Sequence, residues 1–124
     1  MGKFIMKATK TGFVFELKAG NGETIATSQV YSTKESCKTG IESVKANAAA
    51  EIEDQTVEGY VSLKHPKFEV YTDQAGETRF HLKARNGEII AVSQAYKEKS
   101  GALKGIDSVR NNAPEALVEE EKEE

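Results

Sequence analysis

An internal repeat with a period of 65 residues is the strongest constraint on how this chain folds. When the sequence is shifted by 65 positions, residues 15–48 lie over residues 80–113, and 19 of those 34 positions are identical. Such self-similarity indicates a duplicated unit. Because 124 residues is the length of one domain, we expect a single domain in which two half-length copies share a core.

Each copy has the pattern of three strands followed by a helix. In the second copy, apolar and polar residues alternate over residues 68–71 and 79–85, as in strands that bury one face. Asn86-Gly87 then predicts a type I′ hairpin turn, because both central residues of that turn need a positive φ. Asn21-Gly22 predicts the same turn in the first copy.

The helix of the first copy is expected to begin near Ser32. Ser32 and Glu35 have the spacing of a capping box, and apolar residues then recur at helical spacing. We expect Asn47 and Asn112 to end the two helices in the left-handed conformation. A short apolar segment follows each helix and is a candidate for a fourth strand.

One glycine recurs inside each predicted helix. Gly40 and Gly105 occupy the apolar stripe, although a glycine inside a helix costs about 1 kcal/mol relative to alanine. Their recurrence predicts a close backbone approach at these points, either of helix to sheet or of helix to helix.

The repeated motif resembles a known family. Asn-Gly-Glu, Ile-Ala, a Ser and a Tyr, then Gly-Ile-x-Ser-Val and Asn-Ala, occur over Asn21–Ala48 and again over Asn86–Ala113. This pattern is similar to the YegP-like proteins, small bacterial proteins of unknown function with one or two tandem repeats. The resemblance implies an α+β fold of two β-β-β-α-β repeats in a single antiparallel sheet. It further implies two helices on one face, pseudo-twofold symmetry and C-terminal strands exchanged between repeats, but no activity or cofactor.

The chain divides by composition into a nearly neutral body and an acidic end. We expect one domain over 1–119, with repeat 1 at about 3–56, a linker at about 57–66 and repeat 2 at about 67–119. The 17 basic and 20 acidic residues give a net charge of −3. From Glu115 onward there are six acids and one lysine, which is −5, so the remainder carries +2. Residues 120–124 are therefore predicted to be a disordered acidic tail.

The sequence lacks a recognisable catalytic or metal-binding constellation. Cys37 is the only thiol and lies on the apolar stripe of the first helix, which favours a core residue in a reducing compartment. His65 and His81 have no ligand spacing with Cys, Asp or Glu. No apolar run reaches the roughly 20 residues of a membrane helix. We expect no catalytic residue, metal, cofactor or membrane contact, and a cytoplasmic location.

Two groups of polar residues are candidate sites. The first is a polar groove that occurs once per repeat, although its side chains could instead bond backbone groups between the third strand and the helix. It consists of Ser28, Gln29, Tyr31, Ser93, Gln94 and Tyr96. The second is a basic strand face with aromatic character, for which a solvated surface is the plain alternative. It consists of Tyr71, Arg79, His81, Lys83 and Arg85.

These features favour a cytoplasmic, non-catalytic binding or structural module that acts as a monomer, with a protein as its partner. One alternative is a weak single-stranded nucleic-acid binder that uses Arg79, Lys83 and Arg85. Another is a small-molecule enzyme that uses the repeated Ser/Gln/Tyr clusters, for which a deep apolar cleft would be needed.

Overall fold

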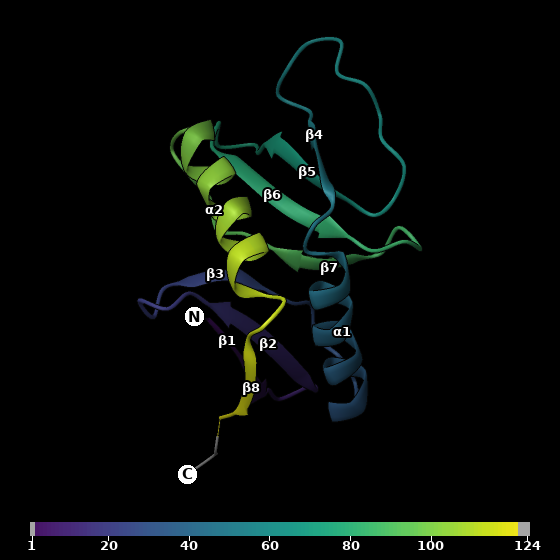
Figure 1. The fold of residues 1–124 in the computed structure, drawn as a ribbon, viewed down its shortest axis with the longest axis vertical. Coiled ribbons are helices and arrows are strands. Elements are labelled where there is room, and N and C mark those ends of the chain that lie inside the picture. The colour runs from purple at the N-terminus through teal and green to yellow at the C-terminus, as the bar shows by residue number, and fades with distance from the viewer. Residues whose placement is uncertain (1, 122–124) are drawn as a thin grey trace.

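One sheet of eight strands runs through both repeats of this computed structural model, which describes residues 2–121, and two helices lie on one face of the sheet (Figure 1). The first repeat contains β1 (Lys3–Ala8), β2 (Phe13–Lys18), β3 (Thr24–Thr27), α1 (Lys34–Asn47) and β4 (Glu51–Asp54). The second contains β5 (Lys67–Thr72), β6 (Thr78–Lys83), β7 (Ile89–Val92), α2 (Lys99–Asn112) and β8 (Leu117–Glu120). The duplicated α+β architecture is confirmed.

The strand order is β4-β5-β6-β7-β3-β2-β1-β8, so the last strand of each repeat belongs to the edge of the other repeat. The two halves meet where β3 runs antiparallel to β7, with Thr27 opposite Val92. The exchanged strands β4 and β8 run parallel to β5 and β1. The sheet is therefore mostly antiparallel, as expected, with parallel pairing only at its two edges.

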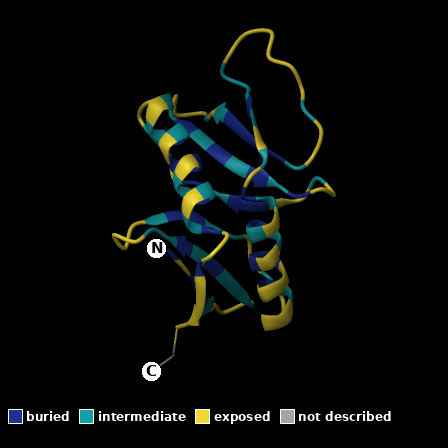
Figure 2. Ribbon diagram, in the orientation of Figure 1, coloured by how far each residue is buried: buried dark blue, intermediate teal, exposed yellow. Residues whose placement is uncertain are grey.

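The core lies between the sheet and the two helices. Buried residues alternate along the long strands (Figure 2). Phe4, Phe15, Phe68 and Phe80 face the helices and are fully buried. Each helix contacts the second strand of its own repeat and the third strand of the other: α1 contacts β2 and β7, and α2 contacts β6 and β3. Because each helix lies over both repeats, neither half has a core of its own. Within residues 2–121, neither helix is long and apolar enough to cross a membrane.

The helix ends differ from those predicted. Thr33, not Ser32, is the N-cap of α1, and its Oγ1 accepts a hydrogen bond from the Ser36 N–H at 3.0 Å. Asn47 and Asn112 keep ordinary φ values, because no residue other than glycine has a positive φ in the described chain. Their side-chain amides donate instead to carbonyls one turn earlier in each helix.

Both Asn-Gly turns also differ from the predicted type I′ form. Only the glycines have a positive φ, 89° at Gly22 and 85° at Gly87. The Gly22 N–H donates to the Ala19 carbonyl, and the Ala19 N–H donates to the Glu23 carbonyl, each at 2.9 Å. This is the pattern of a three-residue loop in which a type I turn is followed by a glycine bulge. The loop is therefore one residue longer than a type I′ turn.

Two residues of the segment predicted as an acidic tail belong to the edge of the sheet. Glu120 is the last residue of β8, and the Glu121 N–H donates to the Met6 carbonyl at 2.8 Å. The prediction of a disordered tail is therefore wrong for these two residues, because their backbone continues the ladder with β1. Residues 122–124 lie outside the described residues.

Candidate functional site

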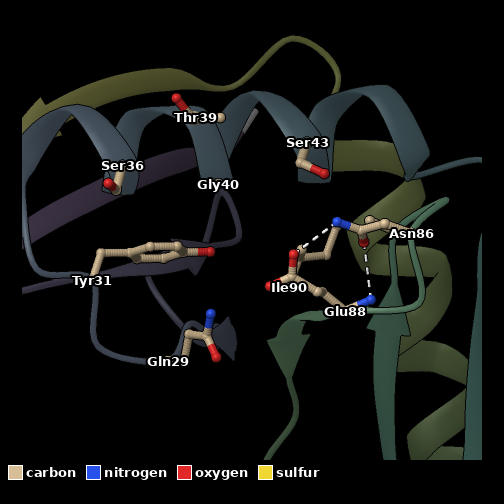
Figure 3. A pocket seen from close by; sticks show the side chains of 10 residues that line it. Gln29, Tyr31, Ser36, Thr39, Gly40, Ser43, Asn86, Glu88 and Ile90 are labelled. Atoms are coloured by element: carbon tan, nitrogen blue, oxygen red, sulfur yellow. Dashed lines mark hydrogen bonds between the residues drawn. The ribbon is translucent and has the colours of Figure 1, made fainter.

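Two equivalent pockets lie where the repeats meet, and each is built from both repeats. The Tyr31 pocket, about 420 Å³, joins α1 to the turn between β6 and β7. It is lined by Gln29, Tyr31, Ser36, Thr39, Gly40, Ser43, Ala84, Asn86, Glu88 and Ile90 (Figure 3). The Tyr96 pocket, about 260 Å³, joins α2 to the turn between β2 and β3. It is lined by Ala19, Asn21, Glu23, Thr24, Ile25, Gln94, Tyr96, Gly101, Lys104, Gly105 and Ser108.

A tyrosine ring forms one wall of each pocket. Tyr31 stacks on Phe15 with ring centroids 6.2 Å apart, and Tyr96 stacks on Phe80 at 6.4 Å. The Tyr31 hydroxyl reaches α1 at Gly40, where a Cβ atom would lie 2.7 Å from the ring carbon Cζ. The recurrent helix glycines thus admit a tyrosine side chain, which corrects the expectation of a close backbone approach.

A carboxylate from the other repeat faces the tyrosine. In the Tyr31 pocket, Asn86 Nδ2 donates to Glu88 Oε1 at 2.7 Å, and the Glu88 N–H donates to Asn86 Oδ1 at 3.0 Å (Figure 3). Asn21 and Glu23 repeat both hydrogen bonds, at 2.8 and 3.0 Å. The Asn-Gly-Glu turn therefore holds its acid in a fixed place.

Burial raises the pKa of both tyrosine hydroxyls. For Tyr31, burial is reinforced by Cys37 and Glu88, and a hydrogen bond with Gln29 opposes it. For Tyr96, burial again leads, Gln94 opposes it and Glu23 adds to it. Both hydroxyls consequently stay protonated at neutral pH, so each can donate one hydrogen bond and accept others.

The predicted polar groove separates into two roles. Ser28 Oγ accepts from the Phe15 N–H at 2.9 Å and donates to the Gln29 carbonyl at 2.7 Å. Ser93 makes the same two bonds in the second repeat. The serines therefore bond backbone groups, whereas the glutamines and tyrosines beside them line the pockets.

The two pockets are not identical. Where the Tyr31 pocket has Thr39 and Ser36, the Tyr96 pocket has Lys104 and Gly101. Only the Tyr96 pocket therefore combines a cation with its carboxylate.

The predicted basic face is largely paired with acids. Arg79 Nε lies 2.8 Å from Asp73, and His81 Nε2 and Lys83 Nζ lie 2.5 and 3.1 Å from Glu69 Oε1. Tyr71 packs on His81 with ring centroids 5.1 Å apart, and Arg85 is exposed at the next turn. Glu69 and Tyr71 lie two residues apart on β5, so their side chains point to the same face of the sheet. The sequence therefore already indicated that an acid shares the face of Tyr71.

A buried carboxylate cluster extends this pairing beneath the segment that joins the repeats. Lys67 Nζ lies 2.7 Å from Glu53 Oε1 and 3.0 Å from Glu69 Oε2, and all three side chains are almost completely buried. The Leu63 N–H, from the joining segment, donates to Glu53 Oε1 at 2.6 Å. No local pattern indicated this cluster, since its residues come from β4, β5 and the joining segment.

The other chemically reactive groups are the Cys37 thiol and the side chains that can hold a metal ion. Cys37 is fully buried, and burial raises the pKa of its thiol. Across residues 2–121, no three His, Cys, Asp or Glu side chains are grouped closely enough to hold a metal ion. Neither pocket lining contains a histidine or a cysteine.

Comparison with known proteins places the chain in a family. A family model described as a domain of unknown function, DUF1508, matches twice, over residues 8–54 and 73–120. The chain belongs to the DUF1508 family. The two matches to DUF1508 coincide with the two repeats, and the predicted YegP-like resemblance is confirmed by the relatives described next.

Relatives of this DUF1508 chain occur in several microorganisms. A UPF0339 protein of Pseudomonas aeruginosa is 38% identical over 120 residues, which is 96% of each chain. A UPF0339 protein of Methanosarcina acetivorans is 62% identical over 52 residues, 42% of this chain and 90% of that protein. The solved structure of Escherichia coli yegP, a protein of unknown function, is 36% identical and has a TM-score of 0.77, covering 96% of this chain and 91% of its own. A UPF0339 protein of Shewanella oneidensis also has a TM-score of 0.77, with 31% identity and coverage of 96% and 90%.

Proposed function

We propose that this chain is a non-catalytic binding module that holds a protein partner through the Tyr31 and Tyr96 pockets. The observation that carries the proposal is the convergence of exposed, duplicated polar residues. Gln29 and Glu88 come from different repeats, are exposed and fill no part of the core, yet they line one pocket and recur as Gln94 and Glu23 in the other. A contact role accounts for this recurrence, whereas packing does not.

The pocket chemistry suits recognition better than catalysis. Both pockets are open to solvent. Each offers a tyrosine hydroxyl, a glutamine amide and a carboxylate held by an asparagine, as seen for the Tyr31 pocket in Figure 3. These groups donate and accept hydrogen bonds with polar side chains of a partner. A reaction would need a nucleophile beside a base. The pocket serines Ser43 and Ser108 instead accept hydrogen bonds from the amides of Asn47 and Asn112 in their own helices.

The nucleic-acid alternative is weaker because two of its three basic residues are paired with acids. Single-stranded nucleic-acid binding requires cations that are free to approach phosphates. Arg79 and Lys83 already pair with Asp73 and Glu69. The proposal also includes a monomeric state and a cytoplasmic location. The single, buried and unpaired Cys37 supports a reducing compartment.

Capture of partners from nuclease-treated lysate, with matched variants, tests this function. Gln29→Ala with Glu88→Gln removes the glutamine amide and the carboxylate of the Tyr31 pocket. Gln74→Ala with Glu58→Gln changes the same residue types at exposed positions outside both pockets. We expect the pocket variant to bind the captured partner about tenfold more weakly, a loss of about 1.4 kcal/mol, and the control to bind normally. Equal binding by both variants, or a partner lost on nuclease treatment, would contradict the proposal.

A further inference from the structure

β8 is an open edge of the sheet. It pairs with β1 on one side and ends the strand order on the other, and it is exposed along its whole length (Figures 1 and 2). Leu117 and Val118 remain 66% and 41% exposed. Since the Glu121 N–H bonds the Met6 carbonyl of β1, the alternation of backbone groups along a strand directs those of Val118 and Glu120 outward. These groups can bond a further strand.

An apolar groove runs beside this edge, between α1 and β8. Its volume is about 260 Å³, and it is lined by Met6, Lys38, Ile41, Glu42, Val118 and Glu120. The other repeat shows what fits there. Leu103 is the residue of the second repeat that corresponds to Lys38, and Ile52 in β4 corresponds to Val118 in β8. Both Leu103 and Ile52 are partly buried against the core. The groove beside β8 is therefore the space that an aliphatic side chain fills in the other half.

The charges on β8 decide between a second copy and a different partner. Glu119 and Glu120 are followed by Glu121, and all three are exposed. Two copies joined edge to edge would bring these acids together, which is destabilising for facing like charges. The acids do pair with lysines, Glu119 with Lys3 at 3.4 Å for example, but such exposed pairs are weak. A basic strand of a partner protein can therefore take the place of these lysines beside the acids.

We propose that the β8 edge binds an extended segment of a partner protein in which basic and aliphatic residues alternate. The segment adds to the sheet as an antiparallel strand, a known mode of peptide recognition. Its residue opposite Val118 or Glu120 points to the helix-covered face, because directly opposite residues share a face, and there an aliphatic side chain enters the groove. The flanking residues point to the other face, where Glu119 lies, and there a lysine or arginine fits. This surface is separate from the two pockets, so its test is independent of the test of the function proposed above.

A synthetic peptide of alternating lysine and isoleucine, seven residues long with lysine at both ends, is the probe. Titration followed by NMR should shift the amide signals of residues 117–121. Hydrogen exchange should slow at the outward amides of Val118 and Glu120. The equivalent amides of β4, Ile52 and Asp54, are the internal control and should not respond, because beside β4 the partly buried Leu103, packed against the core, takes the place of Lys38. A peptide with glutamate in place of lysine should not bind.

Lys38→Leu copies the other repeat and separates binding from folding. The new side chain should fill the groove, raise the melting temperature and weaken peptide binding about tenfold or more. The proposal is overturned if Lys38→Leu binds as tightly as the natural chain, or if the peptide protects β4 as strongly as β8. It is also overturned if light scattering shows a dimer of the free chain and hydrogen exchange shows the β8 amides protected in that dimer. A second copy would then occupy the edge.

Discussion

Replacing either helix glycine by alanine should reveal how tightly the tyrosines are packed, and the two replacements should differ. At Gly40, the three heavy atoms nearest to a new Cβ all belong to the Tyr31 side chain. At Gly105, it meets the Tyr96 hydroxyl oxygen at 2.6 Å and also Phe80 Cε2 at 2.8 Å. Tyr31 is partly exposed and can swing toward solvent, whereas Phe80 is fully buried and cannot.

The expected magnitudes follow from two opposing effects. Alanine in place of glycine stabilises a helix interior by about 1 kcal/mol, and overpacking a buried site costs about 1–3 kcal/mol. Displacing the mobile Tyr31 side chain lies at the low end of that range, so Gly40→Ala should leave the free energy of unfolding nearly unchanged. Gly105→Ala should lose about 1–2 kcal/mol, which for a chain of this size lowers the melting temperature by roughly 5 °C.

Thermal unfolding of the two variants, alone and combined with tyrosine truncation, provides the test. In a Tyr31→Ala background, Gly40→Ala should become stabilising by about 1 kcal/mol, because only the helix preference remains. In a Tyr96→Ala background, Gly105→Ala should stay destabilising, because Phe80 still blocks the new methyl group. Equal effects at the two glycines, or no stabilisation by Gly40→Ala without Tyr31, would refute the packing argument.

Two further predictions concern ionisable groups in the interior. Burial alone would raise the pKa of Glu69, but hydrogen bonds from His81, Lys67 and Lys83 outweigh it and lower the pKa from 4.5 to about 2. The carboxylate therefore stabilises the fold fully above pH 4.5 and loses this contribution, at most about 3 kcal/mol, as the pH falls toward 2. Urea unfolding from pH 6 to 2 should show this loss, and Glu69→Gln should flatten it; an unchanged acid slope would count against the cluster. Cys37 should react with a thiol reagent only after unfolding, because burial shields the thiol and raises its pKa; rapid labelling of the folded chain would disprove that.

Much of the fold could be predicted because the repeat doubles every local signal. Strand alternation and helical spacing each occur twice, so a weak pattern in one copy is supported by the other. The parallel edges could not be found in this way. β4 follows α1 across to the other repeat, and its direction depends on where that helix crosses the sheet. Nothing in the four residues of β4 encodes that path.

Only the part of the candidate site that is local in sequence could be predicted, because the rest comes from the other repeat. Gln29 and Tyr31 are neighbours in sequence, so their grouping was predicted, and Ser28 was grouped with them although its hydroxyl bonds only backbone. Glu88 is the missing half of the pocket, and it comes from the other repeat. Its retention as Glu23 in the first copy was the available signal, because an Asn-Gly turn does not itself need a following acid.

Joining two copies in one chain has a functional consequence that the pseudo-symmetry makes plain. Two identical single repeats would form two identical pockets and two identical sheet edges, since one sequence would supply both. In one chain the copies are free to differ, and most of their differences lie where side chains meet solvent, although Cys37 and Ala102 differ within the core. Thr39 corresponds to Lys104 in the pockets, and Lys38 corresponds to Leu103 beside the edge strands. The duplication therefore turns a symmetric scaffold into one with two unequal pockets and two unequal sheet edges, which under the proposals above lets a partner distinguish the two halves.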